Sequence, residues 1–313
     1  MASRVHRLAD RCAVLYAVCR VMPLAAERRA CRFSFAERPT MSRGRVHMPR
    51  CAIAGVEATV ADTAHSFPRH SHDRFGVGVI VSGGHRSASG RGLVEARAND
   101  AIMVNPGEVH DGSPLDERGR AWRMLYFEPS MLLAATNELA GAASREVELT
   151  LPVAHDPLLT RLFERLFAVS VQAPGVPDDL VREEALLDLF AHLVRTHATL
   201  PARSLSSPAL GPIARAKARI DDDPASPLTL AELAADAGMS RFQLLRGFAH
   251  EMGLPPHAYR MQRRVGLARQ LIARGAALAD AAAAAGFADQ SHMTRAFVRL
   301  LGVTPANYAA AMR

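Results

Sequence analysis

The sequence predicts two domains, an all-β barrel or sandwich with flanking helices followed by an all-α module. Its 313 residues, 49% of them apolar, suffice for two hydrophobic cores and exclude a disordered chain. Residues 51–127 contain short apolar runs between turn sequences, whereas residues 213–313 have helical periodicity throughout. The stretch 198–212 combines Pro, Ser and Gly without periodicity, which indicates a linker.

The β domain is expected to consist of short antiparallel strands. Apolar runs at Val77–Val81 and Ala101–Val104 are bounded by turn sequences such as Gly83-Gly84 and the NPG at 105–107. Strands of this length with turns at this spacing are typical of a small barrel or sandwich.

Three helices are expected to follow the strands. Residues 130–139 have a helical pattern, and Asp156-Pro157 indicates the start of a second helix, with Asp as the N-cap and Pro in the first helical position. A third helix is predicted from about Asp178-Asp179 to Leu193. The wide apolar faces of the last two helices either pack on the β domain or pair with a second subunit, and the sequence leaves both uses open.

The predicted boundaries are 1–47 for a basic extension, 48–197 for the β domain with its helices, 198–212 for the linker and 213–313 for the helical module. Residues 1–40 carry eight Arg against three acidic residues and lack the apolar segment of a signal peptide. The extension is therefore either a disordered arm or translated upstream DNA before a start at Met41 or Met48. We prefer the second interpretation.

The composition favours a polyanionic partner and a reducing compartment. The net charge is +7, and residues 213–313 hold 13 basic against 8 acidic residues, a surplus that suits contact with phosphates. The spacing of the four cysteines matches no zinc ligand set, so we expect neither disulfides nor structural zinc, and a cytoplasmic location. No apolar run approaches the roughly 18–20 residues that span a bilayer, so we expect no membrane partner.

The helical module contains an internal repeat. The segment AELAADAGM from Ala231 matches ADAAAAAGF from Ala279 at an offset of 48, and beyond the turn the offset is 49 because the second copy has one extra residue. In each copy an Ala-rich helix is predicted to end at a glycine, Gly238 or Gly286, whose positive φ lets the chain turn sharply.

Each copy predicts a helix-turn-helix. An N-cap, Ser240 or Asp289, begins the second helix, and Gln243 completes a capping box with Ser240. In such motifs the start of the second helix enters the major groove, where polar side chains contact bases and phosphates. The candidate DNA-binding residues are Arg241, Phe242, Gln243, Arg246, Gln290, Ser291, His292 and Arg295.

The alternative for this module is a purely structural helical bundle. One helix-turn-helix match is weak evidence, but two copies that share glycine, N-cap, apolar and Arg positions favour DNA binding. A long helix predicted from Pro255 to Arg274 would hold the two reading helices about one duplex turn, roughly 34 Å, apart. The outward residues of the copies differ, so we expect two different half-sites.

The module also resembles a known family. The segment GFADQSHMTRAFVRLLGVTPANY, residues 286–308, closely resembles the signature of AraC-type transcription regulators, and residues 238–259 are similar to that family's first DNA-binding unit. The resemblance covers about 100 residues and implies a monomeric module of seven helices that reads two adjacent major-groove segments. One departure is the run Ala281–Ala285, where the family usually has a larger apolar residue, which could loosen the packing of the second unit.

Residues 67–127 resemble the cupin-like sensor barrel of the same family, in which small molecules act as effectors. The segments FPRHSHDRFGVGVIVSGG and NDAIMVNPGEVHDGSP carry this resemblance. In metal-dependent cupins a comparable His-x-His, a carboxylate and a later His bind the ion, but the position of that carboxylate after His72 holds Gly76 and Val77 here. We therefore expect no metal and no cofactor, and assign the histidines to effector hydrogen bonding or to barrel structure. The candidate effector residues are His70, His72, Arg86, His110 and Trp122.

Together these features predict a sequence-specific DNA-binding transcription regulator, controlled by a small molecule in the β domain, and not an enzyme. The expected partners are double-stranded promoter DNA, the effector, RNA polymerase if the protein activates, and a second copy in a homodimer. Two alternatives stay open. One is a metal-dependent cupin enzyme with an appended helical domain, and the other is a DNA-binding protein whose barrel only dimerises.

Overall fold

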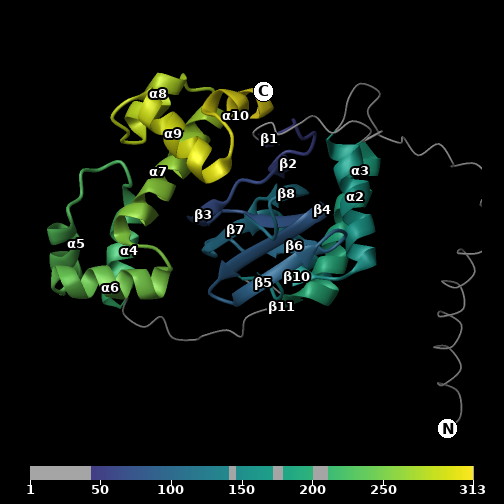
Figure 1. Cartoon of the computed structure of the whole chain (residues 1–313), viewed down its shortest axis with the longest axis horizontal. Helices are drawn as coiled ribbons and strands as arrows, with labels where there is room; N and C mark the ends of the chain where they lie inside the picture. The colour runs from purple at the N-terminus through teal and green to yellow at the C-terminus, as the bar shows by residue number, and fades with distance from the viewer. Residues whose placement is uncertain (1–43, 141–145, 172–178, 200–210, 313) are drawn as a thin grey trace, which may run out of the picture. The chain divides into compact units, whose positions relative to one another are not determined.

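The computed structural model describes residues 44–140, 146–171, 179–199 and 211–312 (Figure 1). The predictions made for residues 1–43, and for most of the linker at 200–210, lie outside these residues. Within the described chain, no helix is both long enough and apolar enough to cross a membrane.

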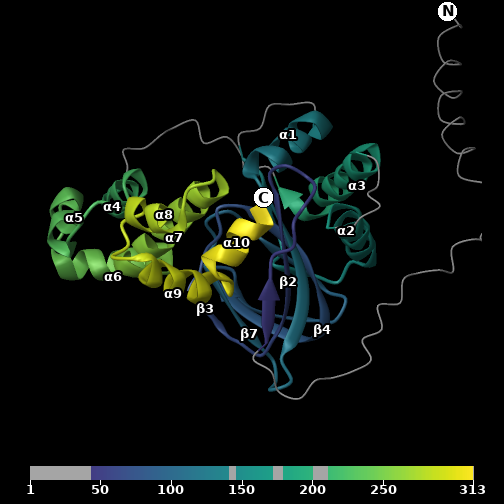
Figure 2. The same ribbon diagram turned by 90° about the horizontal axis from the view of Figure 1, so that it is seen from above.

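The first part of the described chain is built on antiparallel strands (Figure 2). The strands are β1 (Arg45–His47), β2 (Val56–Thr63), β3 (Phe67–His70), β4 (Phe75–Ser89), β5 (Gly92–Arg97), β6 (Ala101–Val104), β7 (His110–Pro114), β8 (Arg120–Phe127), β9 (Glu148–Leu149), β10 (Val153–Ala154) and β11 (Ala198–Thr199). The main path runs β1-β2-β8-β4-β6-β10, with β3, β5 and β7 branching from it. Because β1 pairs with β2, the sheet begins three residues before the predicted domain boundary at residue 48.

Strand β4 belongs to both halves of the sheet. Its first six residues, all buried, pair with β8 and β6, and its second half pairs with β5 and β7. The pairing with β8 shifts register between Ile80 and Ser82, and Gly83 follows with a φ of 73°. A bulge bends a strand and increases its twist, so one long strand leads from one half of the sheet into the other.

The prediction of an all-β domain with flanking helices is confirmed, but the sheet is not a closed barrel. Among the described strands, the two ends of the main path, β1 and β10, pair only with β2 and β6. Barrel closure requires the outermost strands to pair with one another. Here these strands have three and two residues, and such short edges also leave little backbone open for pairing with another chain.

The three predicted helices are present as α1 (Pro129–Ala140), α2 (Pro157–Ser170) and α3 (Asp179–His192), and a π-helical turn, Leu193–His197, follows α3. Phe163 of α2 and Leu189 of α3 are fully buried in one core with Phe127 of β8. The apolar faces of α2 and α3 therefore pack on the sheet, which was one of the two uses that the sequence left open.

The second part of the described chain is a module of seven helices, as the resemblance implies. They are α4 (Pro212–Asp222), α5 (Leu230–Ala237), α6 (Arg241–Met252), α7 (Pro256–Ala273), α8 (Leu278–Ala284), α9 (Gln290–Leu301) and α10 (Pro305–Met312). The pairs α5–α6 and α8–α9 are the two predicted helix-turn-helix units, and α7 runs between them (Figure 1). The turn glycines Gly238 and Gly286 have φ of 66° and 76°, as predicted.

Each unit has its own core, closed by a tyrosine at the equivalent position of the repeat. Phe248 of α6 lies 5.5 Å from Tyr259, and Phe297 of α9 lies 6.1 Å from Tyr308, between ring centres. Three alanines of the second unit, Ala281, Ala282 and Ala285, are fully buried in its core. Small residues there bring α8 close to the helices that it packs against.

Candidate DNA-reading helices and ligand pocket

The start of α6 presents the predicted DNA-binding residues to solvent. Arg241, Phe242, Gln243 and Arg246 are all exposed, whereas Leu244 among them is fully buried. The Arg246 guanidinium lies 5.7 Å from the centre of the Phe242 ring, a cation–π contact on the exposed face. Because a helix N-terminus also carries partial positive charge, this end of α6 suits the phosphates and base edges of a DNA groove.

Gln243 already has a structural role. Its Oε1 accepts a hydrogen bond from the backbone N–H of Ser240 at 3.0 Å, and the Ser240 hydroxyl accepts one from the Gln243 N–H at 3.2 Å. The predicted capping box is therefore confirmed. The DNA contact predicted for Gln243 would therefore use its side-chain NH₂ as the donor.

The start of α9 is the equivalent surface of the second unit. Gln290, Ser291 and Arg295 are exposed there. His292 is half-buried, because its ring packs edge-on against Phe287 with centres 5.3 Å apart. This packing restrains the His292 ring, whereas the side chains of Gln290, Ser291 and Arg295 are exposed. A contact of His292 with DNA would therefore depend on how Phe287 packs beneath the ring.

A cavity that is open to solvent lies against the strands. Four of the five predicted effector residues line it, namely His70, His72, His110 and Trp122. Arg86 is not among the lining residues, because its exposed guanidinium pairs with Glu95 at 2.8 Å.

The helical module contributes to the same cavity. Arg269 of α7 and Leu300 and Leu301 of α9 are lining residues. Sequence reasoning did not nominate them, since all three belong to the module that reads as DNA-binding and no local pattern indicates a contact with the β domain. The cavity is thus lined by residues from both parts of the described chain.

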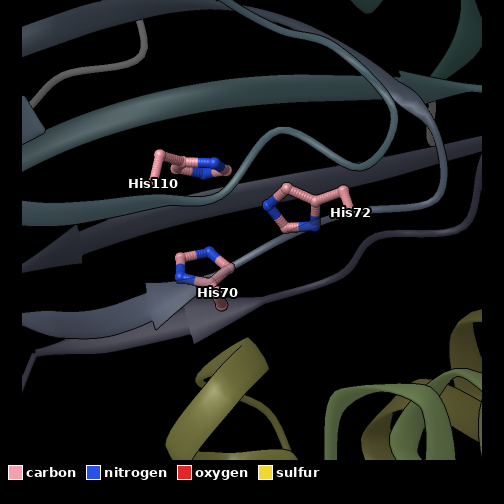
Figure 3. A group of neighbouring side chains, drawn as sticks. All are labelled: His70, His72 and His110. Atoms are coloured by element: carbon pink, nitrogen blue, oxygen red, sulfur yellow. The ribbon is translucent and has the colours of Figure 1, made fainter. Parts of the chain in front are cut away.

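Three histidines form a cluster in the wall of the cavity (Figure 3). One ring nitrogen from each of His70, His72 and His110 lies within 4.8 Å of the others. The Nδ1 atoms of His70 and His110 lie 2.7 Å and 3.0 Å from the carbonyl oxygens of Pro68 and Glu108. A carbonyl can only accept, so Nδ1 carries the proton in both rings and Nε2 keeps its lone pair.

The three histidines could bind a metal ion, but the carboxylate that completes the site in metal-dependent cupins is missing from its usual sequence position. Burial lowers the pKa of His70 to about 3, and burial also lowers the pKa values of His72 and His110, so the rings are neutral. Neutral imidazoles are the form that binds zinc or iron, and three of them leave coordination positions for other ligands. The sequence position where metal-dependent cupins supply a carboxylate holds the buried Gly76 and Val77 of β4.

Arg120 and His85 are lining residues that sequence reasoning missed. Arg120 Nε donates to His85 Nδ1 at 2.7 Å, and the guanidinium lies 4.8 Å from the centre of the Trp122 ring. Four alternate residues of β8, from Arg120 through Trp122 and Met124 to Tyr126, line the cavity, as expected for one face of a strand. Applying this period of two to Trp122 would have found Arg120.

A buried charge network joins β2 to the helical module. Glu57, 4% exposed, forms an ion pair with Arg269 of α7, and its Oε1 accepts a hydrogen bond from the Tyr308 hydroxyl of α10 at 3.0 Å. Arg269 also faces Asp73 at 3.4 Å. Despite burial, the negative charge of Glu57 holds the pKa of Arg269 above its usual value. Ser71 adds a polar contact by donating to Gln262 Oε1 from its hydroxyl at 2.9 Å.

Comparisons with known proteins match both parts of the chain. A family model described as an AraC-like ligand binding domain matches residues 53–190, and one described as a helix-turn-helix domain matches residues 233–311. The HTH-type transcriptional regulator YbfI of Bacillus subtilis is 28% identical over 234 residues, which cover 72% of this chain and 81% of that protein. The transcriptional regulator LumQ of Photobacterium leiognathi is 39% identical over 82 residues, 26% of this chain and 33% of that protein.

A solved structure also shares the fold. Apo ToxT K231A from Vibrio cholerae aligns with 84% of this chain and 100% of its own length, at a TM-score of 0.51 and 12% identity. At this identity the similarity supports the arrangement of a sheet-rich domain and a helical module, and nothing about ligands.

Proposed function

Because this chain is an AraC-type transcription regulator with a ligand-binding domain and a helix-turn-helix DNA-binding domain, we propose that a small molecule in the cavity controls its binding to specific promoter DNA. The two reading helices, α6 and α9, supply the sequence-specific contacts. Their exposed residues differ, so each reads its own half-site.

One observation carries the proposed control, namely that α9 takes part in both sites. Its first turn exposes Gln290 and Ser291, and its last turn places Leu300 and Leu301 in the cavity wall. A ligand changes a conformational equilibrium only if it interacts differently with the two states. A molecule that touches the end of a reading helix satisfies that condition, because any movement of the helix changes the ligand's contacts.

The test is DNA footprinting of the purified protein on the DNA upstream of its own gene, with and without candidate small metabolites. We expect protection of two adjacent major-groove segments, and an affinity for that site that changes at least about tenfold with an effector, a coupling of about 1.4 kcal/mol. Binding no tighter than to random duplex would overturn the DNA-reading half of the proposal. Specific binding that no metabolite alters would leave the alternative of a β domain that only dimerises.

We further propose that the protein acts in the cytoplasm as a homodimer, and contacts RNA polymerase if it activates. The helices that cover the sheet support a second copy, since Leu158 of α2 and Leu187 of α3 are 42% and 55% exposed. Light scattering of the purified chain measures its mass. A monomer at micromolar concentration, both with and without operator DNA, would contradict the dimer.

The competing function is that of a metal-dependent cupin enzyme, which the three-histidine cluster favours. We propose instead that the chain is not an enzyme, because the metal-binding carboxylate is replaced at Gly76 and Val77. Elemental analysis of the protein purified from iron- and zinc-supplemented cells separates the two. One equivalent of metal that is lost in His70→Ala, together with turnover of a substrate, would establish the enzyme.

A further inference from the structure

Arg120 is a buried cation that has no carboxylate partner among the described residues. Its side chain is 1% exposed and is among the largest fully buried side chains of the described chain. Nε donates to His85 Nδ1 at 2.7 Å and Nη1 donates to the His65 carbonyl at 3.2 Å, but no described residue accepts a hydrogen bond from Nη2. Burial lowers the pKa of Arg120 to about 10, so the group is still charged at neutral pH. An unpaired buried charge is costly and needs a compensating partner.

No residue of the cavity wall supplies that partner. Of the three carboxylates among the described lining residues, Glu57 and Asp73 pair with Arg269, and Glu108 lies 3.6 Å from Arg91. His85 cannot supply it, because burial and the adjacent Arg120 lower its pKa to about 3 and keep it neutral. The carboxylates of the wall are thus already paired with other arginines.

A structural arginine in the same chain shows the contrast. Arg260 donates from Nε to the Pro224 carbonyl at 3.1 Å and from Nη1 to the Leu228 carbonyl at 3.0 Å, and its Nη2 donates to the Ser226 carbonyl. Every nitrogen of that guanidinium is used to hold a loop. Arg120 lines a cavity, and its Nη2 is buried without a hydrogen-bond partner among the described residues.

The surroundings of Arg120 define what its partner looks like. The Trp122 ring lies beneath the guanidinium and is packed edge-on by Phe67, with ring centres 6.0 Å apart. Met124 and Val104 continue this wall with apolar side chains. A guanidinium pairs strongly with a carboxylate, and aromatic walls favour an apolar ligand body.

We propose that Arg120 binds the carboxylate of the small-molecule effector, and that this effector is an organic acid whose apolar body lies against Trp122. The proposal rests on the proposed function, because it identifies the chemical class of the molecule that controls DNA binding. Nη2 of Arg120 donates to one oxygen of the ligand carboxylate. The neutral His85 accepts from Arg120 at Nδ1, so it carries its proton on Nε2, which is a further donor to the carboxylate.

The first test uses matched probes and the unaltered full chain. Calorimetric titration compares benzoate with benzamide, hexanoate with hexanol, and benzoate with phenyl phosphate. We expect each carboxylate to bind about 10–100-fold more tightly than its uncharged counterpart, as for a hydrogen bond to a charged group. Failure of both carboxylates to bind at 10 mM, tighter binding of the uncharged probes, or a preference for phenyl phosphate would overturn the carboxylate site.

The second test uses variants. Arg120→Met should abolish the preference for benzoate over benzamide, and Arg120→Lys should retain part of it. Arg118→Met is the matched control, because Arg118 lies two residues earlier and is exposed. An unchanged preference in folded Arg120→Met would overturn the assignment. If Arg120→Met does not fold, the preference of Arg120→Lys decides, and wild-type selectivity there would count against a contact made by the guanidinium Nη2.

Operator binding separates this proposal from the proposed function. A carboxylate that binds through Arg120 but leaves operator affinity unchanged would refute the control of DNA binding and leave the carboxylate site standing. An uncharged molecule that changes operator affinity equally in wild type and Arg120→Met would support the control of DNA binding and refute a carboxylate effector bound by Arg120.

Discussion

At the scale of single residues, Gln243 shows how a structural role limits recognition. An amide usually recognises adenine with its oxygen and its NH₂ together. In this chain the oxygen accepts from Ser240 within the capping box, which leaves the NH₂ as the donor. Gln243 therefore suits acceptor atoms such as those of guanine or thymine. The prediction of its DNA contact came from its outward position, and that position alone could not show the competing bond.

Arg295 provides the most direct test of the reading surface. It is exposed one turn into α9, where the other copy of the repeat places Arg246. Arg295→Ala should weaken operator binding by about 1–3 kcal/mol if the guanidinium contacts guanine, and should lower the salt dependence of binding if it contacts a phosphate. Fluorescence anisotropy at several salt concentrations measures both, with the exposed Arg118→Ala as control. Unchanged affinity and unchanged salt dependence would remove Arg295 from the interface.

Asp156 is a residue whose charge stabilises the fold. Its carboxylate caps α2 and also accepts from His192 Nε2 at 2.7 Å and from His197 Nε2 at 2.8 Å. Burial opposes its ionisation, but the bonds from both histidines and from the backbone hold the pKa of Asp156 well below its usual range. Asp156, His192 and His197 also offer ligand atoms that suit a metal ion. The carboxylate of Asp156 instead accepts hydrogen bonds from the start of α2 and from both histidines.

We predict that Asp156→Ala lowers the free energy of unfolding by about 0.5–2 kcal/mol for the cap alone, and more with the two lost histidine bonds. Asp156→Asn keeps the cap acceptor, so its free energy of unfolding should lie between those of the wild type and Asp156→Ala. A depressed pKa contributes stability that is present above about pH 4 and is lost as the pH falls below it. Urea denaturation at pH 7 and pH 3.5 should therefore show the wild-type advantage shrinking at the lower pH. Three equal midpoints at pH 7 would contradict this role.

At the scale of elements, the two turn glycines are equivalent in sequence but not in surroundings. Both have a positive φ, which costs any other residue about 1–2 kcal/mol. A Cβ at Gly238 would meet only the Arg215 guanidinium at 4.0 Å, whereas a Cβ at Gly286 would lie 2.7 Å from the Ala225 carbonyl oxygen. The loop before α5 packs on the second turn, and a backbone atom cannot easily move aside.

Gly286→Ala is accordingly predicted to destabilise the protein more than Gly238→Ala. Gly238→Ala should cost about 1–2 kcal/mol, and Gly286→Ala should exceed it by the cost of the clash. Guanidinium denaturation of the two variants side by side measures the difference, and each serves as the control for the other. Equal losses would mean that the loop at Ala225 yields without cost.

The elements also show what a sequence can and cannot reveal. The repeat predicted both helix-turn-helix units, their caps and their turns, because those features depend on residues close together in the chain. The sequence left barrel and sandwich open, because barrel closure depends on pairing between the edge strands β1 and β10, which lie over 100 residues apart. For the same reason the residues of α7 and α9 in the cavity wall were not found. Their partners, such as Glu57, are distant in sequence.

At the scale of the whole molecule, Tyr308 connects the reading module to the sheet. Its hydroxyl donates to Glu57 in β2, whereas the hydroxyl of Tyr259, its equivalent in the first unit, donates to Asp221 of α4 at 2.7 Å. Of the two tyrosines at equivalent positions of the repeat, Tyr308 therefore contacts the β domain and Tyr259 forms its hydrogen bond within the helical module.

Tyr308→Phe should weaken the contact between β2 and α10 by about 1.5–3 kcal/mol, the net value of a hydrogen bond to a charged group. Hydrogen exchange measures this as faster exchange in both elements. Tyr259→Phe, the matched control, should speed exchange in α4 and α7 and leave β2 unchanged. The prediction fails if the two variants change β2 equally, because the Tyr308 bond would then have no part in holding the module to the sheet.

The geometry of α9 has a mechanical consequence. Its 12 residues span about 18 Å, and an α-helix of that length behaves as a stiff rod. Under the proposed control, a ligand that displaces Leu300 or Leu301 at one end therefore shifts or tilts Gln290 at the other. Hydrogen bonds to base edges tolerate displacements of only a few tenths of an ångström. A movement of about one ångström at the cavity is enough to put the reading residues out of alignment, with the two parts of the protein still in contact.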